Sequence, residues 1–342
     1  MINLNHYIDS QNSACLLVDV RTPAEYAQGH IPGAVNIPLL SDEQRHIIGT
    51  IYKKNGQAAA IEMGWQLVGN EMQSKANEAL RLYKNKTSCV VYCWRGGLRS
   101  QVMTTLFRDN NIHAEQLENG YKQYRNWAID KWKQPYKLVI IGGKTGVGKT
   151  EILKLLKQKG DSVIDLEGLA NHKGSAYGGI EMPAQPTQEM FENKLAMELY
   201  LHQNNNYILV ESESKLIGKC LLPTIFHQQF LTSFYIVIEI DEQVRLTRIL
   251  NEYGTLPKDQ LALSTIKISK RLGPQHAKQA IEYLELGEIE KWLAIIVVYY
   301  DKKYTGAIDS HTPELLIVQT FDWKNTAASL TKLEETIQQI KI

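Results

Sequence analysis

The sequence has few cysteines, almost no net charge and no long apolar run. Its four cysteines are too scattered for a disulfide framework or a four-cysteine zinc site. A formal net charge of +1 gives no overall attraction for a polyanion, so any nucleic-acid surface must be a local patch. Residues 1–13 lack the basic start and apolar core of a signal peptide, and no apolar run reaches membrane-spanning length. We therefore expect a cytoplasmic protein without a membrane anchor.

The length of the chain, 342 residues, suits two domains. Short apolar strands, such as residues 15–20 and 34–39, alternate with helices in the first part, which predicts a parallel sheet covered by helices. A proline-containing segment, residues 132–137, is the expected linker. We place the first domain at residues 1–131 and the second at residues 138–342.

The stretch YCWRGGLRS, residues 92–100, joins a cysteine to two glycines and two arginines. An apolar β-branched strand precedes Cys93, and we expect a helix to begin after it with Ser100 as its N-cap. Two consecutive glycines allow backbone amides to point into one concave nest, and the arginines add positive charge. Both features favour a thiolate, so Cys93 is predicted to be a nucleophile beside an oxyanion site.

Four blocks of the first part resemble the rhodanese-like domain family and follow its order. They are DVR at 19–21, GHIPGAVNIP at 29–38, the loop at 93–100 and LENGYKQYRNW at 117–127. One departure concerns spacing, because rhodaneses often have four residues between the cysteine and the loop arginine, whereas five separate Cys93 from Arg99 here. Protein tyrosine phosphatases share this longer spacing. A rhodanese-fold sulfurtransferase or phosphatase, with a regulatory nucleotide-binding second domain, is therefore the alternative function.

The second domain begins with the pattern of a P-loop. An apolar strand leads into G-x-x-x-x-G-K-T, and an amphipathic helix follows, which is the context this motif requires. The expected diphosphate ligands are Gly143, Gly146, Gly148, Lys149 and Thr150. The loop amides would wrap a diphosphate, Lys149 would reach its terminal phosphate and the Thr150 hydroxyl would hold Mg²⁺.

Further apolar runs predict a doubly wound P-loop NTPase-like α/β domain. The expected strands lie at 162–168, 207–214, 234–240 and 293–301. Such a sheet binds its ligand at the carboxyl ends of its strands. Glu211 or Glu213 could there act as the acid that binds the metal and its water, although a surface carboxylate is an equally good interpretation of each.

The combination of these two domains resembles the tRNA 2-selenouridine synthase family. The matching blocks are YCWRGGLRS, GGKTGVGKT, DLEGLANHKGSAYGG at 165–179, VESES at 210–214 and SKRLG at 269–273. The resemblance implies a transferase that converts wobble 2-thiouridine in a tRNA anticodon stem-loop to 2-selenouridine. It implies an S-geranyl intermediate made from geranyl diphosphate, then selenium transfer from selenophosphate, which a selenophosphate-producing enzyme would supply.

The resemblance also implies roles for single residues. Cys93 would serve the selenium step, either as a carrier or as the group that attacks selenophosphate. Selenophosphate would be held by Arg95, Gly96, Gly97 and Arg99, with Trp94 shielding the selenium from water. Further candidates in the second domain are Asp165, Glu167, His172, Lys173, Glu211, Glu213 and, as a cation near the P-loop ligand, Arg271. The candidates for tRNA phosphates are Lys267, Lys270 and Lys278, for which a solvated helix face is an equal alternative.

Overall fold

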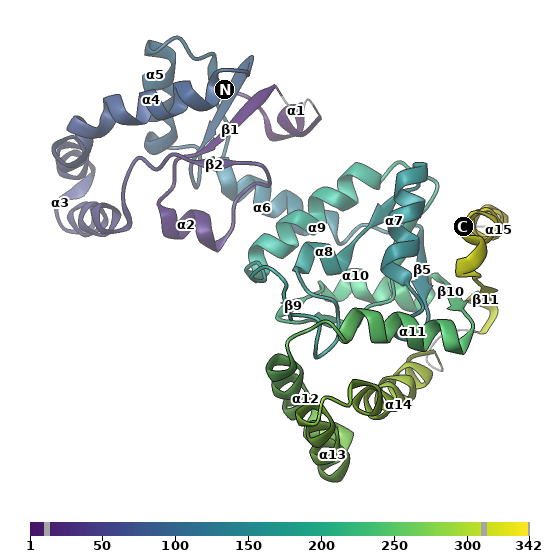
Figure 1. The fold of residues 1–342 in the computed structure, drawn as a ribbon. Coiled ribbons are helices and arrows are strands. Elements are labelled where there is room, and N and C mark those ends of the chain that lie inside the picture. Colours follow the sequence, from purple (N-terminus) through teal and green to yellow (C-terminus); the bar gives the residue numbers. More distant parts are fainter. Residues whose placement is uncertain (10–13, 309–312, 341–342) are drawn as a thin grey trace. The chain divides into compact units, whose positions relative to one another are not determined.

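The computed structural model describes residues 1–9, 14–308 and 313–340. The chain forms two compact units (Figure 1). One unit contains Met1–Asp130 and Glu192–Met197, and the other contains Lys131–Phe191 and Glu198–Ile342. The segment Glu192–Met197 belongs to helix α9 (Gln188–His202), and its inclusion in the first unit was not expected from the sequence.

The first unit is built on a four-stranded parallel sheet with the order β2-β1-β3-β4. Its strands are β1 (Cys15–Asp19), β2 (Val35–Asn36), β3 (Ser88–Tyr92) and β4 (Ala114–Gln116). Its helices are α1 (Leu4–Asp9), α2 (Pro23–Gln28), α3 (Asp42–Val68), α4 (Met72–Tyr83), α5 (Leu98–Asp109) and α6 (Gly120–Lys131). Val18 and Val91 are fully buried on adjacent strands and pack in one core with Phe107 of α5. This parallel arrangement agrees with the predicted fold class.

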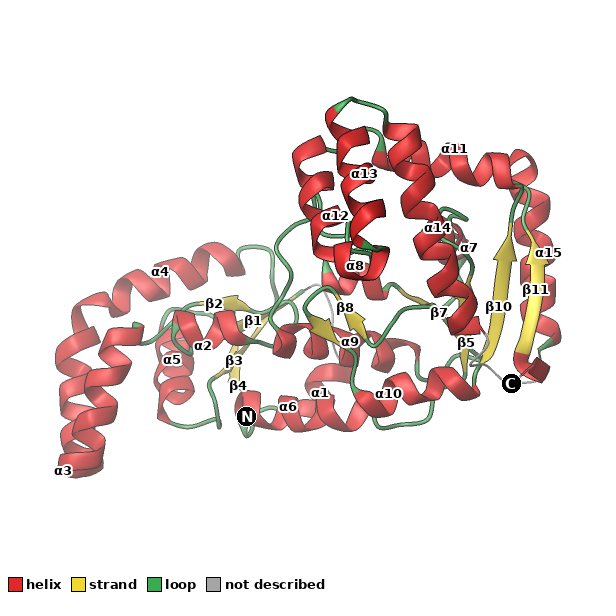
Figure 2. Ribbon diagram, turned by 90° about the horizontal axis from the view of Figure 1, so that it is seen from below, coloured by secondary structure: helices red, strands yellow, loops and turns green. Residues whose placement is uncertain are grey.

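The second unit contains a five-stranded parallel sheet with the order β11-β10-β5-β7-β6. The strands are β5 (Leu138–Gly142), β6 (Val163–Ile164), β7 (Ile208–Glu211), β10 (Phe234–Glu239) and β11 (Leu316–Thr320), and Figure 2 shows β10 beside β11. A separate hairpin joins β8 (Leu216–Ile217) to β9 (Cys220–Leu221). All five residues of β5 are buried, as expected for a central parallel strand that is covered on both faces.

The doubly wound domain also contains helices besides α9. They are α7 (Lys149–Lys159), α8 (Leu166–Ala170), α10 (Thr224–Gln228), α11 (Glu242–Tyr253), α12 (Lys258–Leu272), α13 (Pro274–Glu285), α14 (Ile289–Ile308) and α15 (Thr326–Gln339). Of these, α12, α13 and α14 pack together around Trp292 in a core cluster separate from that of the sheet. Leu153 of α7 and Leu333 of α15 share a core cluster with Ile141 of β5. Because the strands are parallel, the segments that follow β5, β6 and β7 all leave the same edge of the sheet.

Two local predictions were wrong, and one strand was not predicted. Residues 293–301 form part of helix α14, where Trp292, Leu293, Ile296 and Val297 are buried at the spacing of a helix face. The strand expected at 162–168 stops at Ile164, because Asp165 accepts a hydrogen bond from the Gly168 amide and caps α8. The fifth strand is instead β11, near the C-terminus, where no motif was found.

In the described part of the chain, no helix combines the length and the apolar character that crossing a membrane requires.

Candidate functional site

The cysteine loop of the first unit connects β3 to α5. Cys93 follows the last residue of β3, and α5 begins at Leu98 with Gly97 as its N-cap, so the N-cap predicted at Ser100 was wrong. Gly96 has a φ of +64°, and a Cβ atom there would lie 3.0 Å from the carbonyl oxygen of Leu117. Backbone conformation and lack of space therefore both favour glycine at this position.

The sulfur of Cys93 lies against the first turn of α5. The amide of Gly97 donates to it at 3.3 Å, and the hydroxyl oxygen of Ser100 lies 3.2 Å away. Ser100 is itself fixed, because it donates to the carbonyl of Gly97 and accepts from the side-chain amide of Gln116. An amide donor and a helix N-terminus both stabilise a negatively charged sulfur. This geometry suits a nucleophile, whose role stays a prediction.

The polar residues expected around the sulfur differ in their surroundings. The guanidinium of Arg99 makes two hydrogen bonds to Glu25 of α2, at 2.5 and 3.2 Å. Burial raises the pKa of Glu25, but the hydrogen bond and the charge of Arg99 outweigh burial, and the net pKa lies below its ordinary value. Trp94 and Arg95 are exposed. Sequence reasoning assigned Ser100 only as an N-cap, and it missed Glu25 because this residue lies far from Cys93 in the sequence.

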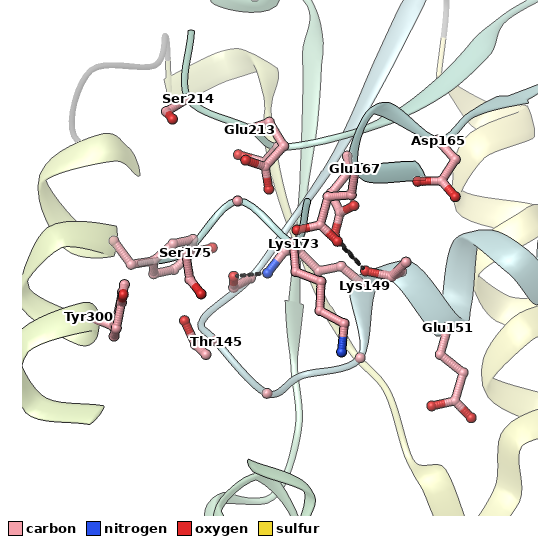
Figure 3. A pocket seen from close by; sticks show the side chains of 18 of the residues that line it. Thr145, Lys149, Glu151, Asp165, Glu167, Lys173, Ser175, Glu213, Ser214 and Tyr300 are labelled. Carbon is pink, nitrogen blue, oxygen red and sulfur yellow. Dashed lines mark hydrogen bonds between the residues drawn. The ribbon is translucent and has the colours of Figure 1, made fainter. Parts of the chain in front are cut away.

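The second unit contains a pocket of about 1150 Å³ that the P-loop lines. All five expected diphosphate ligands line it. The ammonium group of Lys149 donates to the carbonyl of Gly143 at 3.0 Å (Figure 3). Gly148 has a φ of +91°, and a Cβ atom there would lie 2.3 Å from the ring of Trp323. The P-loop thus forms a cradle, and the side chain of Lys149 folds back over it. This is the arrangement that binds phosphate groups.

Three carboxylates meet in this pocket, namely those of Glu167, Glu211 and Glu213. One oxygen of each lies within 4.8 Å of the others, and Figure 3 shows Glu167 and Glu213 close to Lys149. The hydroxyl oxygen of Thr150 lies 2.9 Å from Glu211 and 3.2 Å from Glu167. The second oxygen of Glu211 is buried and has no hydrogen-bond partner among the described residues.

Burial shifts the pKa of all three acids upward, and repulsion within the cluster adds to the shift for Glu167 and Glu213. Burial first, and then the charge of Glu211, raise the pKa of Glu167 to about 9 and that of Glu213 to about 7. Burial also raises the pKa of Glu211. Carboxylates that repel one another around a hydroxyl group fit a hard divalent cation, which would supply the missing positive charge. Their oxygens and Thr150 are therefore the residues that could hold Mg²⁺.

The other candidates of the second unit lie in different places. Asp165 and Lys173 line the pocket, and Lys173 pairs with Glu252 of α11 at 2.7 Å. The Nδ1 atom of His172 is buried without a hydrogen-bond partner among the described residues, and burial lowers the pKa of this side chain.

Arg271 is exposed on α12 and is not among the residues that line the pocket. The arginine that does line it is Arg248 of α11, which stacks on the ring of Trp323 at 3.8 Å and pairs with Glu151 at 2.5 Å. Sequence reasoning missed Arg248, whose only signal is its place in the helix after strand β10.

Among the tRNA candidates, Lys267 and Lys270 are exposed on one face of α12 together with Arg271, and Lys278 is exposed on α13.

Comparison with known proteins gives consistent matches. The family model for the "tRNA 2-selenouridine synthase AAA domain" matches residues 136–335, and the rhodanese-like domain model matches residues 4–128. Proteins named tRNA 2-selenouridine synthase from Shewanella piezotolerans and a Sulfurovum species are 37% and 34% identical, and each match covers 88% of this chain and 90% of the relative. Another, from Shewanella sp. ANA-3, is 39% identical over 81% of this chain and 75% of that protein.

Gly120 is predicted to be indispensable for the cysteine loop. Its φ is +53°, and a Cβ atom there would lie 2.2 Å from the carbonyl oxygen of Cys93. Gly120→Ala should lower the free energy of unfolding by about 2 kcal/mol, because it combines backbone strain with a steric clash. Urea unfolding of the full chain measures this change. Gly69→Ala is the control, since Gly69 has a helical φ of −52° and open space around it; an equal loss in both variants would contradict the prediction.

Glu211 is predicted to be needed for cation-dependent diphosphate binding. In the unsubstituted protein, Mg²⁺ should strengthen the binding of inorganic diphosphate in calorimetric titrations. Mg²⁺ should raise the affinity for diphosphate by a factor at least about tenfold smaller in Glu211→Gln, because this substitution deletes a charged oxygen ligand at nearly constant volume.

The matched control for this experiment is Glu239→Gln, at the exposed end of strand β10 in the same sheet. It should leave the effect of Mg²⁺ intact. An undiminished effect of Mg²⁺ in Glu211→Gln would show that this carboxylate does not hold the cation.

Proposed function

This chain belongs to the tRNA 2-selenouridine synthase family, and on that premise we propose that it exchanges sulfur for selenium in wobble 2-thiouridine through an S-geranyl intermediate. The observation that carries the proposal is the occurrence of two different anion sites in one chain. One is the P-loop pocket, which suits a diphosphate, and the other is the cysteine loop, which suits selenophosphate. Each site would serve one of the two steps.

The first step is geranyl transfer in the P-loop pocket. The sulfur of 2-thiouridine attacks C1 of geranyl diphosphate, the C1–O bond breaks, diphosphate leaves with the electron pair and the base loses its N3 proton. Lys149 and the loop amides would hold the diphosphate and stabilise the charge that develops as it leaves. Mg²⁺, held by Thr150 and the three carboxylates, would neutralise part of the same charge.

The second step delivers selenium at the cysteine loop. S-geranyl-2-thiouridine, selenophosphate and water give 2-selenouridine, geranyl thiol and phosphate, so no oxidant or reductant is required. If Cys93 attacks, the phosphorus atom is the target that keeps this balance: hydroselenide leaves with the electron pair, and water later hydrolyses the S-phosphocysteine. Attack at selenium would instead release phosphorus in a reduced state. The Gly97 amide, which donates to the sulfur, would stabilise the attacking thiolate.

Alkylation of sulfur gives a chemical reason for the order of the two steps. The thiocarbonyl sulfur of 2-thiouridine is a poor leaving group, whereas a geranyl thioether can depart as a thiol after selenium adds to the same carbon. Geranyl transfer in the P-loop pocket must therefore come before selenium transfer at Cys93.

We expect substitutions at the two sites to block different steps. Cys93→Ala should accumulate S-geranyl-2-thiouridine and form no 2-selenouridine. Lys149→Ala should slow geranyl transfer about 100-fold, because it removes a charge that stabilises the leaving diphosphate. Mass spectrometry of nucleosides measures both products from a 2-thiouridine anticodon stem-loop incubated with geranyl diphosphate, with and without selenophosphate.

Two control variants accompany this experiment. Cys15→Ala removes another free thiol, and Lys157→Ala removes another lysine of α7 that does not line the pocket. Both should keep both steps. Equal loss of the two products in Cys93→Ala would contradict the division of labour, and an RNA unchanged by the unsubstituted protein would contradict the proposed reaction.

The five-residue spacing between Cys93 and Arg99 supports a second candidate, a phosphatase or sulfurtransferase with a regulatory P-loop domain. This function would release phosphate from an aryl phosphate, or transfer sulfur from thiosulfate to cyanide, without RNA. Turnover of either compound that disappears in Cys93→Ala, together with an unchanged stem-loop, would favour it.

A further inference from the structure

The P-loop pocket has an apolar wall that the binding of a diphosphate does not use. The wall is formed by Phe230, Leu231, Tyr235 and Tyr304, which all line the pocket. Phe230 and Leu231 lie in the short 3-10 helix Gln229–Thr232, Tyr235 lies in β10 and Tyr304 in α14. Separate elements thus bring two apolar side chains and two tyrosine rings to one pocket.

Tyr235 connects this wall to the phosphate cradle. A Cβ atom on Gly142 would lie 2.2 Å from the ring of Tyr235, so the ring lies on the backbone immediately before Gly143. The phenol hydroxyl donates to the Ser212 hydroxyl at 2.7 Å, and Ser212 follows Glu211 of the carboxylate cluster. The wall therefore begins directly beside the cradle, within reach of an apolar group attached to a bound diphosphate.

The wall offers apolar contact and few hydrogen bonds. Phe230 and Leu231 carry no polar side-chain atoms, and the hydroxyl of Tyr235 is already bonded to Ser212. Burial raises the pKa of Tyr235, so this phenol stays neutral. Leu231 remains 47% exposed, so a ligand that covers it gains the free energy of removing apolar surface from water. A nucleoside would require partners for its ribose hydroxyls and base edges, which Phe230 and Leu231 cannot provide.

We infer that this wall binds the isoprenoid chain of a prenyl diphosphate and that Leu231 limits the length of the chain. The inference rests on the proposed function, in which a prenyl group is transferred from the diphosphate in the cradle. It goes further by assigning the chain to Phe230, Leu231, Tyr235 and Tyr304, and by making this wall the basis of discrimination between prenyl and nucleoside diphosphates.

Binding measurements on the full chain test the wall without any reaction. Calorimetric titrations with Mg²⁺ compare inorganic diphosphate, geranyl diphosphate and ADP. Geranyl diphosphate should bind at least about tenfold more tightly than inorganic diphosphate, because several methylene groups become buried. ADP should gain nothing over inorganic diphosphate. Equal affinities for geranyl diphosphate and inorganic diphosphate, or tighter binding of ADP than of geranyl diphosphate, would overturn the inference.

Leu231→Trp tests the limit on chain length, with Ile225→Trp as a matched control. Both side chains are 47% exposed and six positions apart, but only Leu231 lines the pocket. Leu231→Trp should weaken geranyl diphosphate about tenfold, weaken the shorter dimethylallyl diphosphate less and leave inorganic diphosphate unchanged. Ile225→Trp should change none of the three. Loss of affinity for all three ligands alike, or for none of them, in Leu231→Trp would contradict the assignment.

The outcomes separate this inference from the proposed function. Tight binding of geranyl diphosphate that depends on Leu231, without any S-geranyl product, would contradict the reaction and keep the chain subsite. Geranyl transfer by the unsubstituted protein, with the same preference for chain length in Leu231→Trp, would keep the reaction and contradict the subsite.

Discussion

The burial of three carboxylates beside a P-loop is the constraint on which the second unit depends. Glu167, Glu211 and Glu213 repel one another, and burial removes the water that would screen their charges. Lys149 is the nearby cation that lowers the pKa of each of them, although burial outweighs it. A divalent cation between these oxygens would offset part of their repulsion, which is why the proposed function assigns Mg²⁺ to this cluster. The P-loop and the acids line the same pocket, so the cluster would hold such a cation beside the phosphate cradle.

The first unit depends on a different electrostatic interaction, a buried ion pair beneath the cysteine loop. Arg21 and Asp19 form a fully buried ion pair at 2.5 Å, and the guanidinium lies 3.9 Å from the centre of the Tyr121 ring. The amide of Tyr121 in turn donates to the carbonyl of Cys93 at 2.9 Å. The buried pair thus fixes the ring whose backbone supports the cysteine loop, and the loop can present its amides to the sulfur without rearrangement. A preorganised donor stabilises developing charge better than one that must first move.

The sequence predicted these sites unevenly, for physical reasons. A P-loop is a local motif, because its glycines and Lys149 lie within a few residues of one another, and so the five residues predicted from it all line the pocket. The wall was missed because Phe230, Tyr235 and Tyr304 come from separate elements and follow no spacing rule. Residues 293–301 were misread as a strand because β-branched residues suit a buried helix as well as a strand. These residues are buried in a helix because α12 and α13 pack against α14, and the sequence alone does not show this contact.

Selectivity in the second unit must come from outside the P-loop. Backbone amides, Lys149 and a cation recognise a diphosphate whatever group it carries, so the cradle alone cannot distinguish a nucleotide from a prenyl diphosphate. The Arg248–Trp323 stack lies over Gly148, and Tyr235 lies over Gly142, so large side chains cover the loop at both ends. The group attached to the diphosphate must extend along one of these surfaces. Tyr235, Phe230 and Leu231 line the pocket together, whereas the other surface carries the guanidinium of Arg248, so a hydrocarbon chain is better matched to the side of Tyr235.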